Sequence, residues 1–167
     1  MAEIIKRQDH RREFIDTLVE LAEKDPTITL SIPDVGFLYV DEFSNRFPDR
    51  YFNNGTTELF TIADAAGQAV GGLKPHCYSM RNFILFRPFE GVRNCIVHHN
   101  ANVKLLGVKG STSYRFLGFS HNLSYEDEDT DVCKIIGLRA FKPEGNEEVR
   151  KIIMDTYEDE QSVYVAL

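Results

Sequence analysis

The hydrophobic positions of this chain follow two alternating patterns. Short apolar runs that are typical of buried strands are separated by longer stretches in which apolar residues recur every three or four positions, as on one side of a helix. The short runs predict strands at 28–32, 49–52, 76–79, 102–108, 138–141 and 162–167. The longer stretches predict helices at 9–24, 36–45, 56–72, 83–99, 124–137 and 146–158. Strands that alternate with helices favour an α/β fold, with a mostly parallel sheet and helices on both faces.

The clearest helix is 56–72, which follows a turn at Asn53-Asn54-Gly55 and ends at Gly71-Gly72. Its expected apolar stripe consists of Leu59, Ile62, Ala63, Ala66 and Val70. The many alanines of this helix predict close packing against a sheet or another helix.

Length and composition then narrow the class of protein. The 167 residues fit one domain, 1–167, which ends on its last predicted strand and is expected to be complete with no further domain. A hydrophobic fraction of 43% excludes a disordered chain, and a net charge of -7 argues against a general binder of nucleic-acid backbones. There is no apolar run long enough to span a membrane and no secretion signal at the start. Three scattered cysteines, Cys77, Cys95 and Cys133, indicate reduced thiols and a cytoplasmic protein.

The common short catalytic motifs are absent from the sequence. It has no phosphate-binding glycine loop of either common type, no HExxH and no zinc-finger spacing of cysteines, so no metal ligands are expected. The acidic run 126–129 is interpreted as a solvated helix start.

Three features remain, and each has an ordinary structural interpretation. Glu58 lies in the first turn of a predicted helix, where the helix dipole favours an acid. An aromatic cluster beside Arg87 can simply belong to the core; it comprises Tyr78, Phe83, Phe86 and Phe89. His121 ends a loop rich in glycine and serine, and loops at strand ends are where α/β proteins bind ligands.

Taken in order along the chain, these features form one set of spaced motifs. The set consists of Pro48-Asp49-Arg50, Gly55-Thr-Thr-Glu58-Leu59, the alanine- and glycine-rich stretch 62–72, the aromatic stretch 78–93, Gly118-Phe-Ser-His121, and Pro143 before Glu147-Glu148. It resembles the pyrimidine-binding domain of the transketolase-like thiamine diphosphate enzymes, from about residue 10 to 167. The chain departs from the family at Thr57 and Leu59, where the family usually has a small residue before the glutamate and a glutamine after it.

The resemblance implies roles for individual residues. Glu58 would hydrogen-bond a ring nitrogen of the cofactor's pyrimidine, which requires a carboxyl that holds a proton in a dry pocket, and the flanking Phe and Leu side chains are expected to provide that pocket. Phe83, Phe86 or Tyr78 would stack on the pyrimidine. His121 resembles the histidine that contacts the donor substrate, and Asp34 resembles an acid near the cofactor. Arg87 and Arg115 are the candidates for gripping a substrate.

The family binds the diphosphate through Mg²⁺ with a Gly-Asp-Gly motif, which this sequence lacks. The resemblance therefore implies one subunit of a split enzyme, whose partner carries that motif, in an assembly of two plus two chains. The leading hypothesis is transfer of a two-carbon ketol unit, as in transketolases. One alternative is decarboxylation and ligation of a 2-oxoacid, as in deoxyxylulose phosphate synthases or 2-oxoacid dehydrogenases. The other is a non-catalytic interaction module of the same fold.

Overall fold

The computed structural model describes residues 9–109 and 112–167. Its strands are β1 (Ile28–Ile32), β2 (Tyr51–Asn53), β3 (Lys74–Met80), β4 (Lys104–Val108), β5 (Arg139–Phe141) and β6 (Val163–Ala166). Its helices are α2 (His10–Lys24), α3 (Asp41–Arg46), α4 (Glu58–Val70), α5 (Phe89–Gly91), α6 (Glu128–Ile136) and α7 (Asn146–Tyr157). Tighter or wider helical turns occupy Pro48–Arg50, Asn82–Phe86, Val92–His98 and Thr112–Ser120.

The described strands form one six-stranded sheet in the order β2-β1-β3-β4-β6-β5, and every neighbouring pair is parallel. The predicted α/β class with a parallel sheet is confirmed. After β1 the chain moves outward to β2, whereas after β3 it moves the other way to β4. The carboxyl ends of β1 and β3 therefore flank a topological switch point, which is where open α/β sheets bind their ligands.

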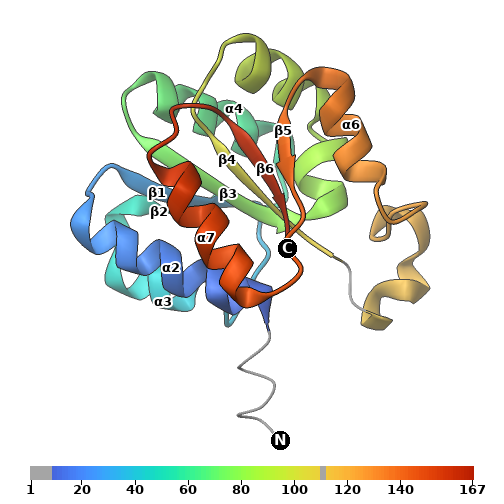
Figure 1. Ribbon diagram of the computed structural model, residues 1–167, viewed down its shortest axis with the longest axis horizontal. Helices are drawn as coiled ribbons and strands as arrows, with labels where there is room; N and C mark the ends of the chain where they lie inside the picture. The colour runs from blue at the N-terminus through green and yellow to red at the C-terminus, as the bar shows by residue number, and fades with distance from the viewer. Residues whose placement is uncertain (1–8, 110–111) are drawn as a thin grey trace, which may run out of the picture.

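The helices cover both faces of the sheet (Figure 1), and the described residues form a hydrophobic core on each face. On one face, α2 and α7 pack against each other and over β1. On the other, α4, α6 and the segment 82–98 enclose the second core. Neighbouring residues of β3 point to opposite faces: Tyr78 belongs to the first core and Cys77 to the second.

The predicted helix at 36–45 is shorter and later than expected. Gly36 and Leu38 both have positive φ angles, +87° and +70°, which a helix does not allow, so α3 begins only at Asp41. The strand predicted at 49–52 begins at Tyr51, because Pro48 starts a helical turn.

The apolar stripe predicted for α4 is partly wrong. The buried residues of this helix are Thr61, Ile62, Ala65 and Ala66. Leu59 is 54% exposed, Val70 is 77% exposed, and Ala63 also faces solvent. The periodicity located the helix correctly, but the face that packs against the sheet is rotated from the expected one.

The acidic run 126–129 is not uniformly solvated. The Asp129 side chain is completely buried and accepts a hydrogen bond of 2.6 Å from the hydroxyl of Tyr164, which is itself fully buried. The Arg81 side chain approaches the same carboxylate, with Nε 3.5 Å from Oδ2. The helix dipole of α6 favours an acid here, and the two neighbours explain how a buried carboxylate is tolerated.

Candidate active site at the carboxyl edge of the sheet

The segments that follow β1, β2, β3 and β4 all lie at the carboxyl edge of the parallel sheet. They carry the residues for which the sequence predicted chemistry: Asp34 after β1, Glu58 after β2, Phe83 after β3 and His121 after β4. A parallel sheet thus brings together four positions that are far apart in the sequence.

Glu58 is the first residue of α4, where the amino-terminal end of the helix favours a negative charge. Its side chain is 11% exposed, and Oε1 accepts a hydrogen bond of 2.7 Å from Nη1 of Arg87. The next two residues, Leu59 and Phe60, are 54% and 59% exposed. The expectation that flanking apolar side chains keep this carboxylate dry is therefore wrong for the isolated chain; the guanidinium of Arg87 covers it instead.

Phe83 joins the other members of the site. The residue is 8% exposed, and the guanidinium of Arg87 lies over its ring, 4.1 Å from the centroid. The ring of His121 meets Phe83 edge-on, with centroids 4.8 Å apart and an interplanar angle of 78°. Glu58, Arg87, Phe83 and His121 thus form one continuous row, which we call the site row.

Helical turns that are wider than an α-helix hold this row in place. Asn82–Phe86 and Val92–His98 are wound as π-helix around Pro88, whose ring cannot fit the interior of a regular helix. Asn82 donates from Nδ2 to the backbone carbonyls of Phe119 and Asn122, at 3.2 and 3.1 Å. Asn82 therefore holds the backbone both before and after His121.

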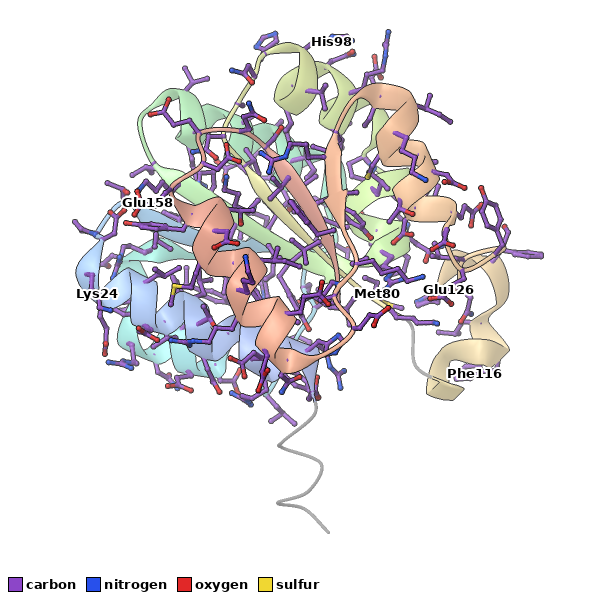
Figure 2. All side chains as sticks on the ribbon, viewed as in Figure 1. Lys24, Met80, His98, Phe116, Glu126 and Glu158 are labelled. Atoms are coloured by element: carbon purple, nitrogen blue, oxygen red, sulfur yellow. The ribbon has the colours of Figure 1, made fainter. Side chains whose placement is uncertain are left out.

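His121 has a second neighbour on its own segment. Its Nδ1 lies 2.7 Å from Oγ of Ser120, and that hydroxyl also donates to the carbonyl of Leu117 at 2.9 Å. The segment turns sharply at Gly118, which has a φ of +62°. Phe116, on the part of this turn that projects away from the sheet, is 83% exposed (Figure 2).

The other predicted aromatics take different positions. Phe86 is partly buried and packs against the core beneath α4. Tyr78 does not join the site row: it is 3% exposed, belongs to the core on the opposite face, and stacks on Phe14 with ring centroids 5.9 Å apart. Because strand residues alternate between faces, Tyr78 and the residues of the site row lie on different sides of the sheet.

Tyr78 and Asp34 instead meet at a cavity. Asp34 has a φ of +57° and accepts a hydrogen bond of 3.0 Å from Nδ2 of Asn53. Both residues line a cavity of about 310 Å³ at the carboxyl edge, together with Arg11, Val35, Gly36, Phe37, Tyr39, Ser79, Met80, Val108 and Lys109. We call this the switch-point cavity, since the ends of β1 and β3 border it.

Sequence reasoning missed Arg11, Ser79 and Lys109 in the lining of this cavity. One signal was available for Arg11: a helix that precedes a parallel strand runs back across the sheet, so its first turn lies at the carboxyl edge. Arg115 belongs to the turn Thr112–Ser120, but its side chain lies outside the described residues.

The remaining chemistry of the described residues is limited. All three cysteines are free, and no group of three or more His, Cys, Asp or Glu side chains in the described part of the chain is placed to hold a metal ion. Within residues 9–109 and 112–167, no helix has the length and apolar character needed to cross a bilayer.

Comparison with known proteins shows what this chain is similar to. No family model matches the sequence. The chain is 29% identical over 157 residues to the B subunit of the apulose-4-phosphate transketolase of Phocaeicola vulgatus, and the match covers 93% of this chain and 49% of that protein. It is 27% identical over 159 residues to a transketolase C-terminal section of Methanocaldococcus jannaschii. That match covers 94% of this chain and 49% of the other protein. The chain is similar to transketolase subunits over most of its length.

A solved structure agrees with this relationship. A chain described as a split gene transketolase, inactive beta4 tetramer, superposes with a TM-score of 0.83 at 28% identity and covers 96% of this chain and 51% of that one. The chain therefore shares the fold of this split-gene transketolase over nearly all of its own length. It spans about half the length of the curated relatives it matches, 49% for both named above.

Proposed function

We propose that this chain is the pyrimidine-binding subunit of a split, thiamine diphosphate-dependent enzyme that transfers a two-carbon ketol unit. The observation that carries the proposal is the site row: a mostly buried carboxylate at a helix start, an aromatic ring beside it and a histidine against that ring. Similarity to the B subunit of a transketolase over 93% of the chain supports the same activity.

The residues present suit the pyrimidine half of the cofactor. Glu58 offers a carboxyl group with little exposure. The guanidinium of Arg87 contacts this carboxylate and also lies over the Phe83 ring. When bound, thiamine diphosphate supplies the electron sink that lets the donor's carbon–carbon bond break. Glu58 would hold a proton at a ring nitrogen of the pyrimidine, and Phe83 would pack on the ring with Phe86 behind it.

The remaining predicted residues would act on the substrate. His121 would hydrogen-bond the donor next to the cofactor, because its segment is fixed against Phe83. Asp34 would instead lie near the cofactor, at the edge of the switch-point cavity that it lines together with Tyr78. Arg87 and Arg115 remain candidates for substrate contacts.

Exposed apolar side chains at the carboxyl edge support a partner chain. They lie on the segments after β1, β2 and β4, the same segments that carry Asp34, Glu58 and His121; the set consists of Phe37, Leu38, Leu59, Phe60, Phe116 and Phe119. Apolar surface of this extent favours protein contact. The proposed partner carries the Gly-Asp-Gly motif and holds Mg²⁺ and the diphosphate, in a cytoplasmic assembly of two plus two chains. The Phocaeicola vulgatus relative is named as a B subunit, and the solved split-gene transketolase is described as an inactive beta4 tetramer, so both are consistent with a separate second chain.

The proposed reaction needs two reactants, a donor ketose and an acceptor aldehyde. The bond between carbons 2 and 3 of a ketose breaks, which releases an aldose shortened by two carbons. Carbon 2 of the ketol unit then bonds to the aldehyde carbon of the acceptor, whose oxygen takes up a proton, so the exchange involves no net oxidation or reduction.

The test uses the chain mixed with its diphosphate-binding partner, thiamine diphosphate and Mg²⁺. Glu58→Gln removes the protonatable group and should lower ketol transfer by about 10²- to 10⁴-fold. Glu90→Gln is the matched control, because Glu90 is an exposed acid on the adjacent helical segment. Thermal unfolding of both variants shows whether the fold is kept. A wild-type rate for Glu58→Gln would refute the role of Glu58.

Product analysis separates the alternatives. Release of carbon dioxide from pyruvate with ligation to an aldehyde, and no reaction with a ketose phosphate, would indicate a 2-oxoacid enzyme. No turnover of either substrate class with any diphosphate-binding partner would indicate a non-catalytic module.

A further inference from the structure

Arg81 is a buried arginine that has no role in the proposed function. It directly follows β3 and precedes the helical segment Asn82–Phe86, which carries Phe83 of the site row. Its side chain is only 5% exposed, and arginine is rarely buried to this extent unless it is paired. Figure 2 labels the residue before it, Met80, and one of its partners, Glu126. The partners of this guanidinium indicate what Arg81 does.

The guanidinium of Arg81 contacts three parts of the chain that are far from it in the sequence. Nη2 donates to the backbone oxygen of Leu167, just after β6, at 3.3 Å. Nε lies 3.5 Å from Oδ2 of Asp129 in α6, and Nη1 lies 3.9 Å from Oε1 of Glu126, which precedes that helix. Arg81 therefore links the end of β3 to the end of β6 and to the start of α6.

Asp129 is the partner that neutralises Arg81. Its side chain is completely buried, so solvent screens the attraction between the two charges only weakly. Glu126 is half-exposed and already pairs with Lys109 at 2.5 Å and with Lys142 at 3.3 Å. Its longer contact with Arg81 therefore adds little. Removal of Arg81 alone would leave a buried carboxylate without its cation, whereas removal of both charges would not.

This ion pair contributes position more than stability. Within the described residues, Nε and Nη1 of Arg81 have no hydrogen-bond partner, so the guanidinium is not fully satisfied. A buried pair with such loose geometry offsets little more than the cost of taking both charges out of water. Its contacts nevertheless fix where the end of β3 lies relative to α6 and Leu167.

The partners of Arg81 also lie at the base of the segment that carries His121. This segment runs from the end of β4 to the start of α6. Lys109, which follows β4, is ion-paired with Glu126, which precedes α6. Both ends of the segment therefore meet beside Arg81.

Asn82 extends this linkage to the part of the segment next to His121. It directly follows Arg81 and donates from Nδ2 to the backbone carbonyls before and after His121. The next residue, Phe83, contacts the His121 ring edge-on, with ring centroids 4.8 Å apart. The backbone that Arg81 anchors therefore carries both of these groups that hold His121.

We propose that Arg81 is a positioning residue for the site row. Its ion pair with Asp129 and its bond to Leu167 hold residues 81–83 where Phe83 and His121 meet. The effect on activity rests on the proposed function, whereas the contact between the two rings belongs to the chain itself and is tested without partner or cofactor.

The decisive variant removes both charges. Arg81→Met/Asp129→Asn leaves neither charge of the buried pair behind, so urea unfolding should have nearly the wild-type midpoint. In the isolated full-length chain, the nuclear Overhauser effect between the rings of Phe83 and His121 should be lost. The amides of 119–122 should exchange at least about tenfold faster, because their segment opens more often. The His121 signals are assigned by their absence in His121→Gln. An unchanged ring contact and exchange rate would overturn the inference.

Arg50→Met is the matched control. Arg50 also donates to backbone carbonyls, those of Ala22 and Asp25 at 3.0 and 2.9 Å, but it precedes β2 at the amino edge of the sheet. This variant should lower the midpoint of urea unfolding and leave the contact between Phe83 and His121 unchanged. Loss of that contact in Arg50→Met as well would show that any destabilisation disturbs it, which would overturn the inference.

Activity and a conservative variant separate positioning from a merely structural role. In the reconstituted two-subunit enzyme, the double variant should lower kcat/KM for the donor ketose about tenfold at wild-type stability. Arg81→Lys keeps a charge for Asp129 but lacks the planar fork, so it should lose only part of the activity and speed exchange at 119–122 less. If the double variant does not fold, Arg81→Lys decides: wild-type exchange there would refute the inference. If the wild-type enzyme transfers no ketol unit, the proposed function fails, and the ring contact still decides about Arg81.

Discussion

Arg87 donates a hydrogen bond of 2.7 Å to the carboxylate of Glu58, although 29 residues separate them in the sequence. Arg87 is half-exposed, whereas Glu58 is largely buried. In the proposed function Glu58 hydrogen-bonds the pyrimidine of the cofactor, so cofactor binding would have to displace the pair between Glu58 and Arg87.

We predict that Arg87→Gln tightens the binding of thiamine diphosphate by the reconstituted enzyme several-fold, because the Glu58 carboxylate no longer has to give up its hydrogen bond with Arg87 when the cofactor binds. Calorimetric titration with Mg²⁺ present measures the Kd. Arg93→Gln is the control, since Arg93 is exposed on the same helical segment and its guanidinium donates to the side chain of the adjacent Asn94. Weaker binding in Arg87→Gln would show that Arg87 itself contacts the cofactor.

Asn82 should act as a positioning residue for His121. Asn82→Ala removes both bonds to the carbonyls of Phe119 and Asn122, and we expect kcat/KM to fall about tenfold through misplacement of His121. Hydrogen exchange of the amides at 116–122 should accelerate in the variant. Asn94→Ala should change neither quantity. An unaltered exchange rate alongside lost activity would mean that Asn82 acts in another way.

His76 makes the stability of the protein depend on pH. It is fully buried, and burial, with Lys104 nearby, lowers its pKa from 6.5 to about 3, so the folded protein holds a neutral imidazole whose Nδ1 donates to the Lys74 carbonyl. Between pH 3 and 6.5 the unfolded chain binds more protons than the folded one, so stability is complete above pH 6.5 and decreases as the pH falls.

We expect the free energy of unfolding to decrease by about 2 kcal/mol from pH 7 to pH 5 because of His76. Urea unfolding at both values measures it. His76→Asn keeps a donor and does not titrate, so its decrease should be smaller. The exposed His98 and His99 serve as controls, because replacing them with Asn should leave the wild-type decrease unchanged. An equal pH effect in His76→Asn would contradict the assignment.

Gly107 provides a test of packing beneath the site. A Cβ at this position of β4 would lie 2.8 Å from ring carbons of Tyr164, a fully buried residue whose hydroxyl is held by Asp129. Gly107→Ala should therefore lower the free energy of unfolding by about 1–3 kcal/mol. Gly67→Ala, in α4 with nothing within 4 Å of the added Cβ, should instead raise it by up to about 1 kcal/mol. The reverse order in urea unfolding would refute this packing.

Much of the fold could be predicted from the sequence because its elements have strong local signals. The apolar run 28–32 and the helical spacing of 9–24 reappear as β1 and α2 within a residue or two. The rotated face of α4 could not be predicted, because Leu59 and Val70 fit the helical period as well as the residues that are actually buried. Periodicity shows that one face is apolar, but the neighbouring elements decide which face is covered.

In the candidate site, too, some features follow from the sequence and others only from the tertiary structure. The sequence determined which residue types stand at the ends of successive strands, and hence that Glu58, Phe83 and His121 meet at one edge of a parallel sheet. The tertiary structure decided the pairing of Glu58 with Arg87, the placement of Tyr78 on the opposite face, and the burial of Asp129 against Tyr164. These contacts join residues 29 or more positions apart, and their geometry depends on how helices pack on the sheet, which a local pattern of apolar and polar residues does not encode.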